Sequence, residues 1–293
     1  MDGLLIVDKP QGISSHDVVA HGRRAIGTRA IGHAGTLDPM ATGVLVLCIN
    51  KATRLSEYLL GEDKFYTGVI RLGQRTNTDD AEGEVLEERS VDDAAITDEA
   101  LASAVAQFRG PIMQVPPQFS AIKRDGKRAY ALARAGESVE LAARPVTIHH
   151  IELKRLPSES SLQTLQTLQI DVACSAGTYI RSLARDIGAL LGCGGHLSAL
   201  RRTKAGSFDQ SQAIPLARLA EWREHILPMD RAVEHFVAVH LDAQGARAMT
   251  QGQSVADVNV AQDGLCRVYD AQGSFLAIGQ VTSRVLKPVK VFA

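Results

Sequence analysis

The sequence predicts an α/β protein, because short apolar segments typical of buried strands alternate with segments that carry a helical apolar stripe. GLLIVDKP (3–10) is expected to be a short buried strand, and FYTGVIRLG (65–73) another strand. GVLVLCI (43–49) is continuously apolar, as expected of a strand buried on both faces. From about residue 238 the chain changes to short strands separated by glycine turns, which predicts a smaller β-rich unit. The 293 residues, 45% of them hydrophobic, suffice for one large core and this smaller unit.

Capping residues and periodicity place the other elements. Ser14 or Ser15 caps the first helix, Thr97 caps another, and Gly192 ends a third that carries a clear apolar stripe. A Gly-Pro pair at 110–111 is expected to stop the second of these helices. In total we expect helices over 14–27, 96–108, 178–192 and 216–228, a strand over 164–175, and a turn at Asp125–Gly126 followed by a helix that ends near Gly136.

Several classes of protein are excluded by what the chain lacks. The longest apolar stretch has seven residues, far below the ~20 that a membrane-spanning helix needs. The N-terminus has no basic region and only four consecutive apolar residues, so a signal peptide is not expected. The four cysteines form no CxxC pair, and no phosphate-binding loop or dinucleotide fingerprint is present. We therefore expect a cytoplasmic protein without a metal or a cofactor.

The net charge of −1 hides an uneven distribution. Residues 61–110 hold five basic and twelve acidic side chains, so the rest of the chain is net positive. Tight basic groups can neutralise phosphates locally even when the total charge is near zero. Such groups occur at Arg23, Arg24 and Arg29, at Lys123, Arg124, Lys127 and Arg128, and at Arg201, Arg202 and Lys204, although each group taken alone is also typical of solvated surface.

The segment GHAGTLDPMATG (32–43) is the outstanding candidate for a functional loop. Its glycines, proline and small residues predict irregular backbone between two core elements, and it carries His33 and Asp38. An Asp before a Pro is also a common turn residue, so this dipeptide alone would decide nothing. KFY (64–66), YIR (179–181) and LRR (200–202) stand at other element boundaries, and together these side chains suit a nucleotide in RNA.

Five blocks of the chain resemble, in the same order, those of the TruB family of bacterial tRNA pseudouridine synthases, which isomerise uridine 55 in the T-loop. The resemblance covers nearly the whole sequence. Small departures are Ala34 where Thr is more usual, Phe119 where Tyr is frequent, and Ala176 where Lys is frequent, which implies one fewer phosphate contact. The blocks are GLLIVDKPQGISSHDVV, GHAGTLDPMATGVLVLCINKATRL, KFYTGVIRLGQRTNTDDAEGEV, PPQFSAIKRDGKRAYALARAGE and CSAGTYIRSLARDIGALLGCGGHLSALRRTKAGSF.

The resemblance implies a role for each site residue. Asp38 would be the catalytic aspartate and Arg181 its partner, and such a pair predicts a low pKa for the carboxyl of Asp38. Tyr66 would stack on the flipped base and support proton transfer, and His33 would fill the space that the uridine leaves. Tyr179 and Leu200 would line the pocket, whereas Lys9 and Pro10 would pack beneath the loop.

The reaction needs a carboxylate but no metal, cofactor or energy source, which agrees with a sequence that contains no phosphate-binding loop, dinucleotide fingerprint or CxxC pair. Asp38 could attack C1′, attack C6 or remove the C2′ proton in a glycal route, of which we favour the last.

The resemblance also implies the overall organisation. We expect a mixed, mainly antiparallel sheet flanked by helices in a catalytic domain over 1–237, with an RNA-clamping insertion at about 121–145, and a PUA-like RNA-binding domain over 238–293. The T-arm and acceptor stem of tRNA would be the partners of a monomer that needs no other protein. The residues expected to contact RNA are Lys64, Lys123, Arg124, Lys127, Arg128, Arg201 and Arg202.

Two other functions remain open at this stage. The first is an RNA chaperone that assists tRNA folding, which is compatible with catalysis. The second is a guide-RNA-dependent pseudouridine synthase of the archaeal and eukaryotic type, although the insertion after residue 120 and the short C-terminal tail suit the bacterial form better.

Overall fold

The computed structural model describes residues 1–92, 94–120, 123–124, 127–128, 141–157, 166–260 and 262–292. Ten strands in these ranges form one sheet, with the order β14-β1-β3-β12-β4-β11-β10-β7, and with β2 and β13 attached to β3 and β12. Among the described strands of this sheet only the β1–β14 and β3–β12 pairs are parallel, which confirms the predicted mixed, mainly antiparallel sheet. The strands are β1 (Gly3–Lys9), β2 (Ile31–His33), β3 (Thr42–Ile49), β4 (Lys64–Leu72), β7 (Gly110–Gln114), β10 (Arg144–Arg155), β11 (Thr167–Cys174), β12 (Gly195–Ala205), β13 (Phe208–Asp209) and β14 (Ile214–Pro215).

The N-terminal half of the sheet is covered on both faces, which explains why β1 and β3 are continuously apolar. Leu5 and Val7 pack into the cluster that contains α1 (Ser15–Ile26), and Leu4 and Ile6 into the cluster that contains α2 (Ser56–Leu60). The α1 helix begins with a capping box between Ser14 and Asp17.

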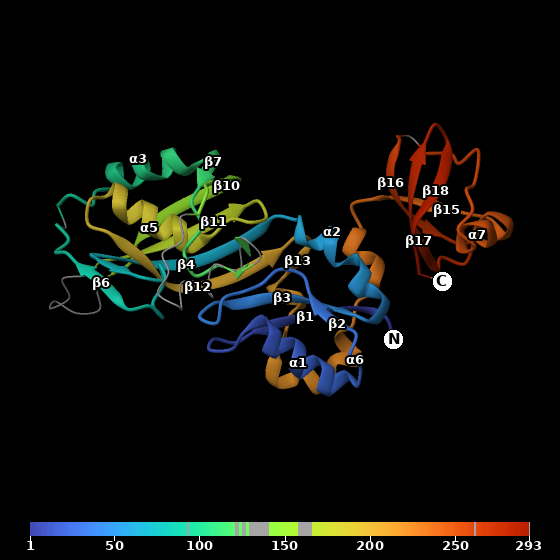
Figure 1. Ribbon diagram of the computed structural model, residues 1–293, viewed down its shortest axis with the longest axis horizontal. Helices are drawn as coiled ribbons and strands as arrows, with labels where there is room; N and C mark the ends of the chain where they lie inside the picture. The colour runs from blue at the N-terminus through green and yellow to red at the C-terminus, as the bar shows by residue number, and fades with distance from the viewer. Residues whose placement is uncertain are drawn as a thin grey trace.

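The C-terminal half of the sheet carries helices α3 (Asp98–Phe108) and α5 (Ile180–Leu190), which lie together along one side of the strands in Figure 1. Their apolar residues share a core cluster with Ile70, Ile170 and Leu197 of β4, β11 and β12. Thr97 caps α3 as predicted. The helix ends at Phe108, just before the Gly-Pro pair at 110–111 as predicted, and the left-handed Gly110 then opens strand β7 at the edge of the sheet.

Short elements complete the main body. The helix expected over 216–228 is divided into the 3-10 helix η3 (Leu216–Glu221) and the single turn α6 (Trp222–His225). Strands β5 (Gln74–Thr76) and β6 (Val85–Glu88) form a small hairpin. Strands β8 (Lys123–Arg124) and β9 (Lys127–Arg128) form another. The helix expected to end near Gly136 lies outside the described residues.

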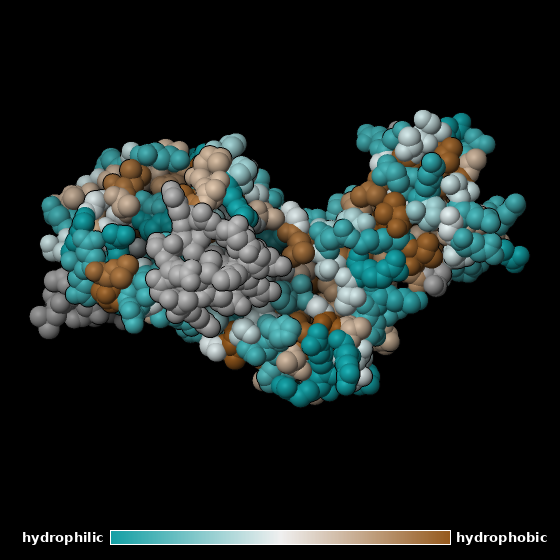
Figure 2. Space-filling model, viewed as in Figure 1, coloured by the Kyte–Doolittle hydropathy of each residue, from teal (hydrophilic) through white to brown (hydrophobic). Residues whose placement is uncertain are grey.

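The C-terminal segment forms its own four-stranded sheet, β15-β16-β17-β18, with a separate apolar cluster. It stands to one side of the main body in Figure 1, and Figure 2 shows a broad notch between the two. The Nζ atom of Lys51 in η1 (Asn50–Leu55) donates to the carbonyl of Phe292 over 2.5 Å, which ties the small sheet to the main body. The elements are β15 (Val237–His240), α7 (Ala243–Thr250), β16 (Gly264–Tyr269), β17 (Phe275–Thr282) and β18 (Val285–Val291).

Candidate active site

Asp38 lies on the irregular loop between β2 and β3, and three buried polar side chains hold this loop from below. The Nζ atom of Lys9 donates to the carbonyls of Pro10, Ile13 and Pro39, at 2.9, 2.7 and 3.2 Å. The hydroxyl of Ser15 accepts from the backbone N–H of Leu37 over 2.8 Å and donates to the carbonyl of the same residue. Because Lys9 is fully buried, its role is to fix the loop, as predicted.

Arg202 is the third anchor of the loop. Its Nε atom donates to the carbonyl of Val44 over 2.7 Å, and its two terminal nitrogens donate to the carbonyls of Gly35 and Thr36. Gly43 has a φ of +101° and lies directly against the backbone of Arg202, where a Cβ would be 2.2 Å from the carbonyl oxygen. Gly43 is therefore required by close backbone approach as well as by its positive φ.

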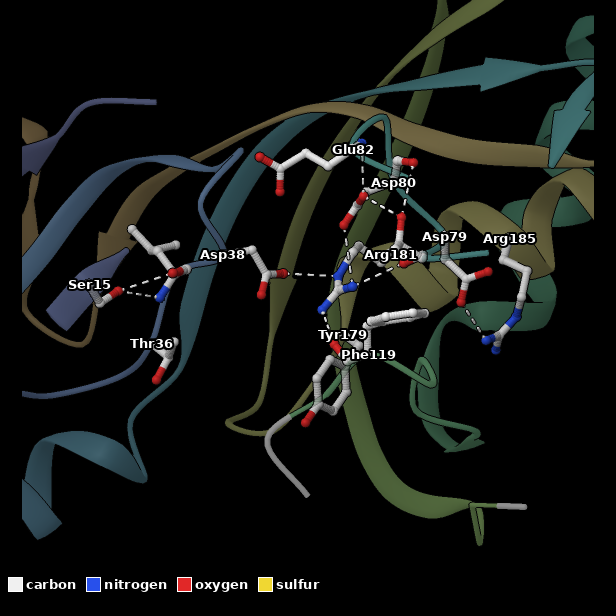
Figure 3. Close-up of polar contacts among 12 residues, drawn as sticks. Ser15, Thr36, Asp38, Asp79, Asp80, Glu82, Phe119, Tyr179, Arg181 and Arg185 are labelled. Atoms are coloured by element: carbon white, nitrogen blue, oxygen red, sulfur yellow. Dashed lines mark hydrogen bonds and ion pairs between the residues drawn. The ribbon is translucent and has the colours of Figure 1, made fainter. Parts of the chain in front are cut away.

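Arg181 reaches Asp38 from the first turn of α5, as Figure 3 shows. Its Nε atom lies 2.9 Å from Oδ2 of Asp38, and one terminal nitrogen lies 3.3 Å from Oδ2 of Asp80. The two terminal nitrogens also donate to the carbonyls of Thr78 and Phe119, each over 3.0 Å. The guanidinium is thus held on several sides, with its Nε atom close to the carboxylate of Asp38.

The electrostatics of Asp38 differ from the prediction. Burial raises the pKa of its carboxyl above the usual 3.8, the Arg181 guanidinium opposes this rise, and the charge of Asp80 adds to it. The predicted low pKa is therefore wrong, because the ion pair does not outweigh the loss of hydration deep in the site. The side chain is still 37% exposed, so a ligand can reach it.

An acidic loop after β5 contributes residues that the sequence did not single out. Asp80 is 3% exposed, and its Oδ1 accepts from the Thr78 hydroxyl over 2.6 Å and from the backbone N–H of Glu82 over 3.0 Å. Next to it, Asp79 pairs with Arg185 of α5 over 2.9 Å. The only sequence signal was the density of acids in this segment, which does not distinguish one carboxylate from another.

Two of the predicted pocket residues are tyrosines that face the charge of Asp38. Burial raises the pKa of both Tyr66 and Tyr179, and the charge of Asp38 raises each of them further. Tyr179 precedes α5, where its backbone N–H donates to the Gln114 side chain over 2.8 Å. The structure therefore brings Asp38, Arg181, Tyr66 and Tyr179 into one site.

His33 and Leu200 both lie near Arg202. His33 ends β2, and its buried Nδ1 has no hydrogen-bond partner in the described part of the chain. Burial and the charge of Arg202 lower the pKa of its imidazole, which favours the neutral ring. Leu200 lies on β12, two residues before Arg202, and is 9% exposed.

Two of the predicted RNA contacts are buried in the protein interior. Lys64 is 6% exposed and donates to the carbonyls of Leu59, Leu60 and Glu62 at the end of α2. Arg202 is 1% exposed and is bound to the loop. Neither side chain can reach a phosphate without leaving these bonds, which corrects the prediction for both. Arg201, by contrast, is 37% exposed and forms a bidentate pair with Asp8, at 2.9 and 3.0 Å.

Four predicted RNA contacts remain, and they are the paired strand residues of the β8–β9 hairpin: Lys123, Arg124, Lys127 and Arg128. Most of the predicted insertion at about 121–145 lies outside the described residues.

Metal-ligand spacing occurs in one group of the residues that the structure describes, Glu221, Glu224 and His225. This group lies on η3 and α6, and Glu221 is already paired with Arg218. No helix of the described ranges is both long and apolar enough to span a membrane.

Three family models match consecutive segments of the chain. Residues 23–180 match the family model described as "TruB family pseudouridylate synthase (N terminal domain)". Residues 181–234 match "tRNA pseudouridylate synthase B C-terminal domain", and residues 238–292 match "Pseudouridine synthase II TruB, C-terminal".

Curated relatives and solved structures extend the similarity over the whole chain. A tRNA pseudouridine synthase B of Arthrobacter sp. (strain FB24) is 49% identical, over 100% of this chain and 97% of the relative. The protein of the same name from Thermobifida fusca (strain YX) is 48% identical, over 100% and 99%. Among solved structures, a Cbf5-Nop10-Gar1 complex is similar with a TM-score of 0.73 at 28% identity, over 99% of this chain and 85% of the other.

The three matching models together span both the site and the C-terminal sheet, and the relatives are similar from end to end. Asp38 lies within the segment matched by the first model, and its partner Arg181 begins the second. The chain therefore belongs to the TruB family of pseudouridylate synthases.

Proposed function

We propose that this protein isomerises uridine to pseudouridine at position 55 in the T-loop of tRNA. The observation that carries the proposal is the Asp38–Arg181 pair, flanked by two tyrosines, in a chain whose relatives of 46–49% identity are named tRNA pseudouridine synthase B. The reaction breaks the C1′–N1 bond, turns the base and joins C1′ to C5, and the C5 proton is lost as N1 gains one. Every heavy atom of the base is retained, so the protein needs only to hold the uridine and move protons.

The residues divide this work in a definite way. The carboxylate of Asp38 would act on the ribose or on the base, and Arg181 keeps that carboxylate in one orientation. An aromatic face can hold a uracil without preventing its rotation, which suits Tyr66 as the stacking surface. The target nucleotide must first leave the RNA stack, and the neutral ring of His33 would occupy the space that it leaves.

Surfaces away from Asp38 would bind the rest of the RNA. Arg201 lies in the wall of a cavity of about 650 Å³, together with Lys9, Pro10 and Thr42, and Asp38 is not among the lining residues. We propose that Arg201 and the basic β8–β9 hairpin contact the T-arm, and that the C-terminal sheet contacts the acceptor stem. In this proposal residues 1–237 form the catalytic domain, 121–145 the clamping insertion and 238–293 the PUA-like domain.

A stand-alone monomer in the cytoplasm is the setting we propose for this activity. Solved structures of 26–28% identity include an H/ACA RNP bound to a substrate RNA and a complex with Nop10 and Gar1. The bacterial relatives are more similar, cover the same full length, and carry a name that refers to tRNA. This contrast favours direct recognition of tRNA over a guide RNA and partner proteins.

The test uses a T-stem-loop transcript with tritium at C5 of the target uridine, because pseudouridine formation releases that atom to water. The wild-type protein should release tritium. Asp38→Asn should reduce the rate by at least about a thousandfold while changing Kd little, as expected when a group that acts in the transition state is lost. Asp171→Asn is the matched control, since Asp171 is bonded to Thr67 on the opposite face of β4 from Tyr66. Full activity of Asp38→Asn would exclude the assignment.

A tRNA-folding activity is a second proposal for the same surfaces. The RNA contacts proposed above lie outside the catalytic pair, so binding would survive loss of chemistry. Asp38→Asn should therefore still accelerate the refolding of a misfolded tRNA, and loss of that acceleration together with catalysis would exclude a separate chaperone function.

A further inference from the structure

Arg202 is a buried cation whose presence needs an explanation. It is 1% exposed, yet no carboxylate of the described residues lies within 4.0 Å of its guanidinium. Its partners are the carbonyls of Gly35, Thr36 and Val44, at 3.0, 3.4 and 2.7 Å. Taking a charge out of water without an opposite charge is costly, and a neutral side chain could have filled the same space. A cation kept in this position suggests that the charge itself has a use.

The groups around Arg202 show what its charge acts on. Tyr66 pairs with Arg202 in the register between β4 and β12, and the guanidinium lowers the pKa of its phenol against the effect of burial. From β2, His33 faces the same charge, which lowers the pKa of the imidazole. From β4 and β1, the ammonium groups of Lys64 and Lys9 each have a pKa lowered to about 8 by burial, with a further contribution from Arg202. Cys174 of β11 faces Tyr66 and Lys64 as a neutral thiol.

We infer that Arg202 is a positioning residue of the uridine site: it fixes the catalytic loop through three carbonyls and presents its charge to the Tyr66 hydroxyl and the His33 imidazole. The inference rests on the proposed function. When the C1′–N1 bond breaks, its electron pair remains on the uracil, and a polarised hydroxyl at the base is a stronger donor toward that charge. An imidazole held neutral can stack in the place of a base without carrying a charge of its own.

The test removes the charge while retaining an unbranched side chain that can follow the path of the arginine stem. In Arg202→Met the single-turnover rate on the T-stem-loop should fall at least about tenfold, with Kd within about twofold of the wild type. NMR titration of the His33 ring should show a higher pKa than in the wild-type protein, because the opposing cation is gone. Arg71→Met is the control, since Arg71 is an exposed residue of β4 outside the site. A wild-type rate, or a lower rate with an unchanged His33 titration, would overturn the inference.

Arg202→Lys keeps the positive charge but loses the guanidinium that contacts three carbonyls. It remains informative if Arg202→Met does not fold. It should keep the His33 titration near that of the wild type and still lower the rate. In a Tyr66→Phe background the relative loss should be smaller, because the hydroxyl that Arg202 polarises is already absent. Equal losses in both backgrounds would overturn the link to Tyr66. If wild-type protein itself released no tritium, the proposed function would fail, whereas the His33 titration would still test the inference.

Discussion

The Nε atom of Arg181 lies 2.9 Å from Oδ2 of Asp38, while a terminal nitrogen of the same guanidinium lies 3.3 Å from Oδ2 of Asp80. The guanidinium of Arg181 therefore contacts two carboxylates. The side chain of Asp38 is 37% exposed, and the side chain of Asp80 is 4% exposed. The buried carboxylate holds the guanidinium, and the carboxylate of Asp38 remains accessible to a ligand. Because the two carboxylates lie on the same guanidinium, the negative charge of Asp80 opposes the ionisation of Asp38.

The pH dependence of catalysis should reflect this sharing. Only the ionised form of Asp38 can act as base or nucleophile, so the rate should fall as the pH drops through its pKa, which is raised above 3.8. Asp80→Asn removes a charge that raises this pKa, so its acid limb should lie at lower pH than that of the wild type. Single-turnover rates measured across the acid range, with circular dichroism at each pH, would show the order of the two limbs. An acid limb at higher pH in Asp80→Asn would contradict this account.

The same raised pKa predicts the stability of Asp38→Asn. A carboxyl with a higher pKa in the folded state than in the unfolded state binds its proton more tightly when folded, so its ionised form opposes folding above the unfolded pKa. Asp38→Asn should therefore be at least as stable as the wild type near neutral pH. This difference should vanish when the pH falls below about 3.8, where both states are protonated. Urea unfolding at several pH values measures it, and a variant clearly less stable at neutral pH would contradict the sign.

Asp80→Asn should behave in the opposite way. Asp80 is 3% exposed, and its carboxylate contacts Arg181, the Thr78 hydroxyl and the backbone N–H of Glu82. Loss of its charge should lower the free energy of unfolding by roughly 1–3 kcal/mol, because a buried guanidinium loses one of its two carboxylates. Catalysis should fall through kcat more than through KM, since Arg181 orients Asp38 less firmly. Equal stability of Asp80→Asn and Asp38→Asn in urea would contradict the division of roles between the two acids.

The loop at 32–43 that carries Asp38 could be predicted from the sequence, whereas the residues that hold the site around it, such as Asp80, could not. Glycines, a proline and an Asp between two apolar strands form a local pattern that is visible in twelve residues. Asp80 stands beside Asp79 in an acidic segment, and only the folded chain decides which of the two lies against Arg181 and which against Arg185. The number of acids is a sequence property, but their partners depend on tertiary structure.

The burial of Lys64 and Arg202 likewise depends on tertiary structure and could not be predicted from the sequence. Lys64 and Arg202 were predicted as phosphate contacts from the resemblance and, for Arg202, from its place in a tight basic group. Their burial follows from the pairing of β12 with both β3 and β4, which brings residues more than a hundred positions apart into one layer. Helices with local signals, such as the Ser14 and Thr97 caps, were predicted correctly because their determinants lie within a few residues.

The basic hairpin provides a prediction about RNA affinity. The quadruple variant replaces Lys123, Arg124, Lys127 and Arg128 by Ala. It should bind tRNA more weakly and reduce the slope of log Kd against log salt by up to about 3, because binding with fewer phosphate contacts releases fewer counterions. Filter binding at several salt concentrations measures the slope. Arg71→Ala is the control, as Arg71 is exposed on β4 and outside the proposed RNA surface. An unchanged slope in the quadruple variant would return the hairpin to ordinary solvated surface.

Gly43 should be the least replaceable glycine of the catalytic loop. A Cβ at this position would lie 2.2 Å from the carbonyl oxygen and 2.9 Å from the nitrogen of Arg202, and neither backbone atom can move without breaking the β3–β12 pair. Gly43→Ala should therefore cost more than about 3 kcal/mol of unfolding free energy and displace the loop that carries Asp38. Gly27→Ala is the matched control, because Gly27 also has a positive φ, of +76°, but nothing lies within 4 Å of its Cβ position. It should cost only about 1 kcal/mol, from backbone strain alone, and leave the rate unchanged. Urea unfolding of both variants and tritium release measure the contrast, and equal stability of the two would show that the contact with Arg202 does not constrain the loop.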